Sequence, residues 1–413
     1  MDIEEIDLAG TDFWSKPLTY REKAFDLLRS EAPYSYFDLP EEVYEHFPQS
    51  GFYSLVRHSD VAEVSRRPED FCSGNGATSV IDFGEEMNSF FGSMINMDDP
   101  RHKRLRSIVS SGFTPRRLAI VEDSVQRIAE EILLKAKNKN ECDFVVDVAA
   151  QLPLLVICEM MGVPKDRVNF VFDQSNIILG AGDEEYTPEG ADVLGAIMGA
   201  AFELNALMNE MLEERSKEPT EDLTSALLYA ELDGERLTKE EIVSFFILLL
   251  VAGNETTRNA LSWGMHLLTE YPKQREILCN DFENKIPNAV EEIVRWSSPV
   301  IFMRRTVTRD GVRLGEKEFS KGDKLSLYYW AANRDSSIFS NPHDFNILRD
   351  SNDHFGYGAP GSHFCLGAHL ARREITVMLR EIFKTIPDIR AVEEPDRLLS
   401  GFINGIKHLP CSW

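Results

Sequence analysis

The stretch HFGYGAPGSHFCLGAHLARRE, residues 354–374, places four glycines and a proline around one cysteine, Cys365. A helical pattern rich in Leu, Ala and Arg begins directly after that cysteine. A cysteine just before a helix lies at the positive end of the helix dipole, where backbone N–H groups stabilise a thiolate. Gly361 and Gly367 allow backbone or a ligand to approach the sulfur closely. The chain must therefore fold so that a Gly-rich loop presents Cys365 at the start of a helix.

Three interpretations of Cys365 are open at this point. The sulfur can be a buried thiol in a Gly-rich turn, a nucleophile, or a metal ligand. No Cys-His-Asn arrangement with protease-like spacing supports the nucleophile. A single thiolate holds iron only where a macrocycle supplies the other ligands, which means haem. The other five cysteines, at positions 72, 142, 158, 279 and 411, form no CxxC pair and no zinc pattern, and we expect Cys142 and Cys158 to be core thiols.

The composition excludes several classes of function. The chain has 44 Lys and Arg against 69 Asp and Glu, a formal net charge of −25. We therefore expect no nucleic-acid partner and no anionic membrane partner for the chain as a whole. The longest strongly apolar run, residues 245–252, is well short of the roughly 18 residues that a membrane span needs. The chain also starts with acidic residues and no apolar segment, so we expect a soluble, cytoplasmic protein. We also expect it to be a monomer.

Hydrophobic periodicity predicts a mainly α-helical chain with small β-sheets, an α+β fold that forms one domain over residues 1–413. Helical spacing marks residues 122–139, 196–215 and 366–386. One very long helix is expected within residues 237–272, with a capping box of Thr238 and Glu241 at its start and an end before Pro272. Strand signals are short and lie at residues 51–56, at 313–331 as a hairpin-like pair, and at 400–413.

The cysteine loop resembles the haem-binding loop of the cytochrome P450 family. In that family an aromatic residue and glycines precede the cysteine, His or Arg stands two residues before it, and Gly stands two after it. Here these positions hold Tyr357, Gly358, His363 and Gly367 around Cys365. The loop is one residue longer than the commoner form, as in the bacterial branch that oxidises steroid side chains. The resemblance implies the P450 fold, with haem between the long helix and the helix that follows Cys365.

Further motifs follow in the family's order. HKRLR places His102 and Arg106 four residues apart on one helical face, where the resemblance implies contacts with a haem propionate. FMRRTVTRD supplies Arg305, five residues before Asp310, as the counterpart of the second propionate arginine. Arg304 is the competing candidate by one step of register.

EEIVR holds Glu292 and Arg295 at a spacing of three residues. A bare pair of this kind is more often a surface ion pair that contributes little stability. The resemblance implies instead a buried structural pair that is closed by Arg349 of FNILRD.

AGNETTR, residues 252–258, lies inside the long predicted helix. Gly253 either packs at a helix crossing or leaves room for O2 near the iron. Thr256 can bond back to the Ala252 carbonyl and open the helix locally. Glu255 adds an ionisable group, and an acid beside an alcohol is what a proton relay to iron-bound O2 requires. The resemblance implies that Gly253, Glu255 and Thr256 are catalytic and that Ala252 belongs to the haem-binding residues.

The resemblance implies a haem-thiolate monooxygenase that inserts one oxygen atom of O2 into a C–H bond, with haem b (iron protoporphyrin IX) as cofactor. No flavin or nicotinamide fingerprint is present, so electrons are expected from NAD(P)H through a separate ferredoxin and ferredoxin reductase. Basic residues near the expected thiolate side could steer an acidic ferredoxin or could simply be solvated helix faces. They are Arg101, Lys103, Arg104, Arg116, Arg117, Arg372 and Arg373.

The expected substrate is a hydrophobic small molecule, because the segments where the family places its specificity are apolar here. The candidate contacts are Phe90, Phe91, Ile178, Leu249, Val300, Phe302 and Ile403, although any one of them can be a core residue. We expect hydroxylation of a steroid or terpenoid, with a polyketide-type or other secondary metabolite as the alternative. The intact Glu255–Thr256 pair disfavours a haem-binding sensor or carrier and a peroxide-driven enzyme, while desaturation stays open.

Overall fold

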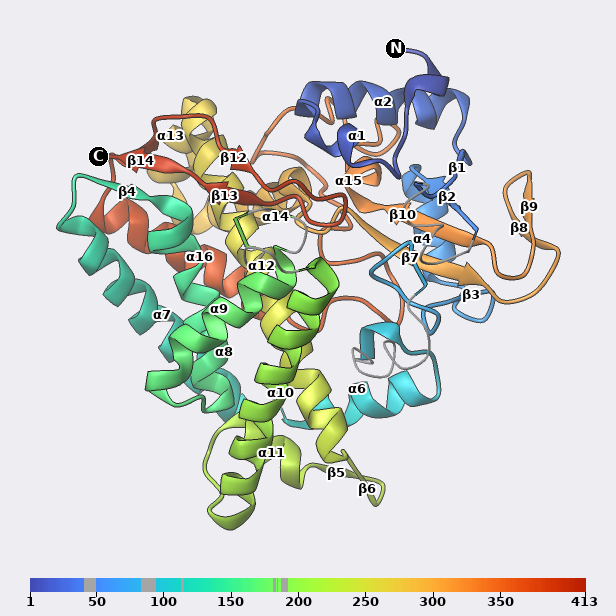
Figure 1. The fold of residues 1–413 in the computed structure, drawn as a ribbon. Helices are drawn as coiled ribbons and strands as arrows, with labels where there is room; N and C mark the ends of the chain where they lie inside the picture. The colour runs from blue at the N-terminus through green and yellow to red at the C-terminus, as the bar shows by residue number, and fades with distance from the viewer. Residues whose placement is uncertain (41–49, 83–93, 113–114, 181–182, 184, 187–191) are drawn as a thin grey trace. The chain divides into compact units, whose positions relative to one another are not determined.

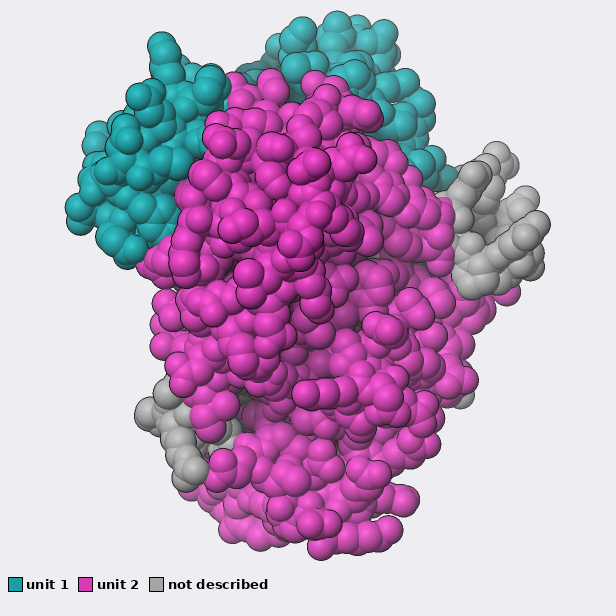
Figure 2. Space-filling view, turned by 90° about the vertical axis from the view of Figure 1, so that its left-hand side faces the viewer, with its two compact units in different colours: residues 1–98, 271–368, 399–404 teal, residues 99–270, 369–398, 405–413 magenta. Residues whose placement is uncertain are grey.

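The structure is a computed structural model that describes residues 1–40, 50–82, 94–112, 115–180, 183, 185–186 and 192–413 (Figure 1). The chain folds into two compact units, each built from three separate stretches of sequence (Figure 2). Unit 1 comprises residues 1–98, 271–368 and 399–404, and unit 2 comprises residues 99–270, 369–398 and 405–413. Because neither unit is a continuous stretch of sequence, we retain a single domain over residues 1–413 as a proposal.

Unit 1 contains a five-stranded sheet with the strand order β1–β2–β10–β7–β3. Its strands are β1 (Tyr36–Phe37), β2 (Phe52–Leu55), β3 (Phe71–Cys72), β7 (Phe302–Val307) and β10 (Lys324–Tyr328). A separate hairpin joins β8 (Val312–Leu314) to β9 (Lys317–Phe319). The hairpin-like pair expected within residues 313–331 is therefore present as β8 and β9, but the stretch also holds a third strand, β10, that does not join the hairpin. Strand β10 instead pairs in parallel with β2 and antiparallel with β7, because the tertiary fold brings these distant segments together.

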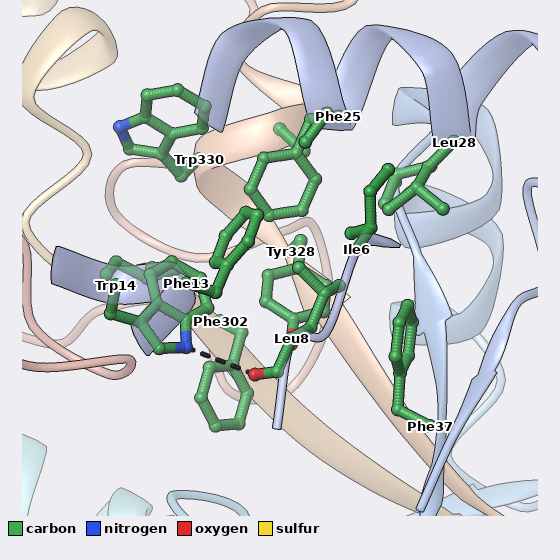
Figure 3. Packing of buried hydrophobic residues seen from close by; sticks show 14 of the residues in the cluster. Ile6, Leu8, Phe13, Trp14, Phe25, Leu28, Phe37, Phe302, Tyr328 and Trp330 are labelled. Carbon is green, nitrogen blue, oxygen red and sulfur yellow. Dashed lines mark hydrogen bonds between the residues drawn. The ribbon is translucent and has the colours of Figure 1, made fainter. Parts of the chain in front are cut away.

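The sheet of unit 1 is covered by apolar clusters on both faces, because neighbouring side chains of a strand point to opposite sides. Phe302 and Tyr328 pack on one face with aromatic residues of the first helices, Trp14 among them (Figure 3). Leu325 and Leu327 belong to a second cluster. The helices of unit 1 are η1 (Ile3–Glu5), α1 (Thr11–Ser15), α2 (Leu18–Glu31), α4 (His58–Ser65), η2 (Met94–Asn96), α13 (Pro272–Asn280), α14 (Phe282–Ser297) and α15 (Tyr329–Ala332).

Unit 2 is mainly helical, and α8, α9, α10 and α11 all contact the long helix α12 (Lys239–Glu270). The predicted capping box is present, since the Thr238 amide donates to Glu241 Oε2 over 3.0 Å and the Glu241 amide donates to Thr238 Oγ1 over 3.2 Å. The other helices are α6 (Arg101–Gly112), α7 (Pro115–Lys137), the π-helical turn η3 (Val145–Ala149), α8 (Gln151–Met161), η4 (Lys165–Arg167), α9 (Val168–Leu179), α10 (Val193–Lys217), α11 (Leu223–Tyr229) and α16 (Ala368–Thr385).

The strands of unit 2 are short. They are β4 (Glu141–Asp143), β11 (Arg390–Ala391) and β14 (Pro410–Ser412) in one sheet, and the pairs β5 (Glu231–Leu232) with β6 (Glu235–Arg236) and β12 (Asp396–Arg397) with β13 (Ile406–His408). The predicted mainly α fold with small sheets is confirmed. Among the helices in the described parts of the chain, none combines the length and the hydropathy that a membrane crossing needs.

Glu374 is a buried acid within unit 2. It lies on α16, is 2% exposed, and makes a side-chain hydrogen bond with Thr257 of α12. Its other carboxyl oxygen, Oε1, is buried without a hydrogen-bond partner among the described residues. Burial raises the pKa of Glu374 to about 8, and the bond with Thr257 only partly offsets this rise. The carboxyl is therefore mostly protonated at neutral pH.

We expect Glu374→Gln to make the protein more stable toward alkaline pH. The unfolded acid, with a pKa near its ordinary value of 4.5, releases its proton before the folded acid does, at about 8. The wild type therefore loses stability as pH rises between these two values, and the amide variant lacks this slope. Thermal unfolding measured between pH 4.5 and about 8 gives the difference. The control is Glu393→Gln, which makes the same change at an exposed glutamate. A pH slope in Glu374→Gln equal to that of the wild type would contradict the assignment.

Candidate active site

The loop before α16 presents Cys365 as the sequence predicts. Its thiol is exposed, and α16 begins three residues later at Ala368. The Cys365 amide donates to the Tyr357 carbonyl over 2.9 Å, which closes the loop on itself. A Cβ added to Gly361 would lie 2.3 Å from the Ser65 carbonyl oxygen, so the loop needs glycine at that position. An exposed thiol at a helix start suits a metal ligand better than a packed core thiol.

Gly367 and His363 flank the sulfur along the chain. A Cβ added to Gly367 would meet Cys365 Sγ at 3.9 Å, an ordinary contact, so protein atoms alone do not require glycine here. His363 lies two residues before the cysteine in the same loop and is partly buried. By contrast, Cys142 and Cys158 are buried core thiols as expected, and burial raises the pKa of each to about 12.

Strand β7 sends Arg304 and Arg305 to opposite faces of the unit 1 sheet, because they are adjacent in the strand. Arg304 is fully buried and donates to the carbonyl oxygens of Ser79 and Asn75 over 3.1 and 2.7 Å, and its Nη2 lies 2.6 Å from Asp82 Oδ1. Protein groups therefore surround the Arg304 guanidinium. This geometry favours Arg305 over Arg304 as the propionate-binding arginine.

Helix α6 places His102 and Arg106 one helical turn apart, as the spacing predicts. His102 is 2% exposed, and its Nδ1 lies 3.5 Å from Asp99 Oδ1. Arg106 is partly buried. Both side chains are therefore donors of unit 2 that one anionic group could share.

Helix α12 carries the acid–alcohol pair. Thr256 Oγ1 donates to the Ala252 carbonyl over 2.8 Å, the predicted back-bond. The expected local opening of the helix does not accompany it, since α12 runs from Lys239 to Glu270 without a break. A hydroxyl can join the helical ladder at a carbonyl that already accepts a backbone bond, so the bond alone does not open the turn.

Glu255 is 1% exposed and forms an ion pair with Arg258, while Asn259 Nδ2 donates to Glu255 Oε1 over 2.9 Å. The sequence did not predict this partnership, although the spacing of three residues between Glu255 and Arg258 is a signal for it. Glu255 Oε2 is buried and has no hydrogen-bond partner within the described residues. The acid is thus held at one oxygen and open at the other.

Gly253 of α12 lies next to a side chain of α8. A Cβ added there would lie 2.9 Å from Ile157 Cδ1 of α8. The Ile157 side chain would have to shift to admit a larger residue at this position. Room for O2 beside Gly253 stays a prediction.

The candidate substrate contacts fall into three groups. Phe90 and Phe91 lie outside the described residues. Ile178 and Leu249 are partly buried on α9 and α12 of unit 2. In unit 1, Val300 and Ile403 form an isolated β-bridge, and Phe302 packs edge-on against Phe402 with ring centroids 5.6 Å apart.

The basic residues proposed for a ferredoxin surface are only partly available. Arg104 forms ion pairs with Glu235 and Glu241, so it is engaged within unit 2. Arg101 and Lys103 are exposed. The side chains of Arg116 and Arg117 lie outside the described residues.

Glu292, Arg295 and Arg349 meet in unit 1 as the resemblance implies. Glu292 Oε2 lies 2.7 Å from Arg295 Nε, and Glu292 Oε1 lies 2.9 Å from Arg349 Nε. The side chains of Glu292 and Arg295 are fully buried. The bare surface ion pair is therefore excluded.

Comparisons with known proteins agree with this geometry. The family model "Cytochrome P450" matches residues 193–386. A methyl-branched lipid omega-hydroxylase of Mycobacterium tuberculosis is 46% identical over 100% of this chain and 95% of its own length. A steroid C26-monooxygenase of Mycolicibacterium smegmatis is 40% identical over 92% of this chain and 88% of its own length.

A solved cytochrome P450 of Mycobacterium marinum in complex with pseudoionone has a TM-score of 0.93 and 36% identity, and covers 99% of this chain and 98% of its own. A cytochrome P450 of Bacillus megaterium in complex with corticosterone has a TM-score of 0.81 and 32% identity, and covers 94% of this chain and 97% of its own. The fold, the order of the motifs and the relatives that match nearly the whole chain all support one family. The chain belongs to the cytochrome P450 family and is a cytochrome P450 monooxygenase, an enzyme class that uses haem and O2.

Proposed function

We propose that this monooxygenase hydroxylates a steroid or terpenoid at an unactivated carbon of a branched aliphatic chain. The observation that carries the proposal is the identity of 46% and 40% to enzymes whose names specify a methyl-branched lipid and a steroid. Steroid side chains, terpenoids and methyl-branched lipids share a branched hydrocarbon end. The apolar character of Val300, Phe302 and Ile403 in unit 1 suits such a group.

In each unit the candidate residues have the chemistry that a haem needs from its protein. Cys365 offers an exposed sulfur before a helix in unit 1, Arg305 is the arginine on the opposite face of β7 from Arg304, and α6 of unit 2 carries His102 and Arg106 as further donors. We propose that Cys365 ligates the iron and that these three cationic or polar side chains hold the propionates. When bound, haem supplies an iron that activates O2, and a thiolate ligand favours O–O cleavage.

Proton delivery is proposed to depend on α12. The Thr256 hydroxyl donates its hydrogen to the Ala252 carbonyl, so the Thr256 oxygen can still accept a hydrogen bond from a proton donor. Glu255 has one open carboxyl oxygen and is anchored at the other by Arg258 and Asn259. We infer that Glu255 relays protons through its open carboxyl oxygen and that the Thr256 hydroxyl positions them for transfer.

Electrons are proposed to come from NAD(P)H through a ferredoxin and its reductase. The exposed Arg101 and Lys103 support an acidic partner, whereas Arg104 is engaged by two glutamates.

The polyketide-type alternative has less support. A structural neighbour is a cytochrome P450 of a Bacillus subtilis bacillaene polyketide synthase, at 29% identity and a TM-score of 0.86. That identity is well below those of the lipid and steroid enzymes.

Thr256→Ala is expected to bind haem and substrate nearly as the wild type does but to uncouple the reaction, because the alcohol that positions the proton is lost. Product formed per NAD(P)H consumed should fall severalfold and hydrogen peroxide should rise, in an assay with a surrogate ferredoxin and reductase. Ser262→Ala is a matched control, since Ser262 makes the same kind of back-bond to Arg258 over 2.8 Å in the same helix. Unchanged coupling in Thr256→Ala would mean that protons arrive by another route.

Titration of the haem-loaded protein with cholesterol, a branched terpene, a straight-chain fatty acid and a macrolide tests the substrate class. Cholesterol or the terpene should shift the Soret band toward high spin at micromolar concentrations, because a seated apolar molecule displaces water from the iron. A shift that only the macrolide or the fatty acid produces would refute the steroid or terpenoid proposal and leave the enzyme class standing.

A further inference from the structure

Residues 75–82 form a coil in unit 1 with no helix or strand, yet most of them are at least partly buried. Backbone carbonyls that are withdrawn from water need hydrogen-bond partners. Here two cationic side chains of the sheet supply them. We propose that Arg304 and Lys324 are positioning residues that hold this segment against the sheet and thereby set the affinity for hydrophobic substrate. This inference rests on the proposed function, because it places the hydrophobic substrate beside Phe302, one of the candidate substrate contacts of unit 1.

Arg304 binds the first part of the segment. Its backbone amide donates to the Ala77 carbonyl over 2.7 Å. Its guanidinium donates to the carbonyls of Ser79 and Asn75, and also to Thr306 Oγ1 over 3.2 Å within β7. The side chain is 1% exposed, so these bonds form away from bulk water.

Lys324 of β10 binds the last part. Its Nζ lies 3.0 Å from the Val80 carbonyl and 2.8 Å from Asp82 Oδ2. The other oxygen of Asp82, Oδ1, lies 2.6 Å from Arg304 Nη2. One carboxylate thus bridges the two cations. The side chain of Lys324 is 3% exposed, and lysine is rarely buried unless it is paired.

The register of the sheet explains why these two residues can act together. Lys324 pairs with Thr306, and Ser326 pairs with Arg304. Lys324 and Arg304 are therefore diagonal neighbours on one face of an antiparallel pair. That face also carries Phe302, two residues before Arg304, since alternate residues of a strand share a face.

Residues 75–82 contact the apolar cluster that contains Phe302, a candidate substrate contact. Val80, whose carbonyl accepts from Lys324, packs against the apolar cluster of Figure 3, which contains Phe302. Phe402, which contacts the Phe302 ring, packs against the same cluster. A shift of Val80 would therefore change the packing around Phe302, so loss of the Lys324 ammonium should loosen substrate binding and leave the oxidation step intact.

Four variants of the haem-loaded full chain test this. Lys324→Met removes the ammonium and keeps the length of the side chain, and Lys324→Arg restores a cation. Asp82→Asn removes the bridging charge at a side chain that is 43% exposed, so the fold should survive. Lys321→Met is the matched control, since it makes the same change at an exposed lysine three residues earlier.

The probe is cholesterol, and the readouts are its apparent Kd, kcat against KM, and amide hydrogen exchange of residues 75–82 in ligand-free protein. Lys324→Met and Asp82→Asn should each raise Kd and KM about tenfold, a coupling typical of residues in one network, with kcat unchanged. Exchange of residues 75–82 should accelerate in both. Lys324→Arg and Lys321→Met should behave as the wild type.

The proposal is overturned if Lys324→Met leaves Kd unchanged while the wild type binds cholesterol, or if it lowers kcat and leaves KM unchanged. It is equally overturned if Lys321→Met has the same effect, because that effect would then not depend on the buried contact. A wild type that binds no sterol would count against the proposed substrate class. Unaltered amide hydrogen exchange of residues 75–82 in Lys324→Met would instead show that Lys324 does not hold this segment. The two failures are thus distinguishable.

Discussion

The network around Glu292 is the interaction on which the long coil of unit 1 depends. Glu292 accepts hydrogen bonds from the guanidinium groups of Arg295 and Arg349. It also accepts from the Asn346 amide over 2.8 Å and from Asn352 Nδ2 over 3.1 Å. Arg295 donates to the carbonyls of Asn333, Pro342 and Asp344, and Arg349 donates to those of Ser340, Asn341 and Asp344. Residues 333–352 contain no helix or strand, so these side chains take the place of a backbone ladder.

The energetic role of such a network follows from its burial. Removing charges from water is costly, and a buried ion pair often adds little net stability over an apolar core. Breaking it by losing one partner is far more costly, because a charge is then left uncompensated. The network therefore specifies one path for the coil that leads to the Cys365 loop. Arg304 and Lys324 apply the same principle to residues 75–82, where cations of a sheet satisfy the carbonyls of a coil.

The acid–alcohol pair shows a different use of burial. Arg258 neutralises one oxygen of Glu255 inside the helix bundle of unit 2, and the second oxygen has no partner among the described residues. A group that is held at one end and unsatisfied at the other is poised to interact with water or substrate. Glu374, also with one unsatisfied oxygen, is instead kept mostly protonated by burial, which raises its pKa to about 8. Two buried acids of unit 2 are thus stabilised in different ways, one by a cation and one by a proton.

Local chemistry is what the sequence by itself determined. The Gly-rich loop before a helical pattern, the capping box of Thr238 and Glu241, and the i−4 bond from Thr256 to Ala252 all depend on residues within a few positions of one another. Hydrophobic periodicity was enough for the long helix and for the mainly α fold. Family motifs linked Glu292 with Arg349 across the chain, and the structure places them in contact.

Tertiary structure decided what depends on distant partners. It paired β10 with β2 and β7 instead of with its sequence neighbours, because parallel pairing across a long separation has no local signal. It directed Arg304 to Asp82 and left Arg305 on the other face, a difference that one step of register produces. It also paired Arg258 with Glu255 and buried Glu374 and Lys324. Burial depends on what packs around a side chain, and so the partners of these residues and the raised pKa of Glu374 could be known only from the folded chain.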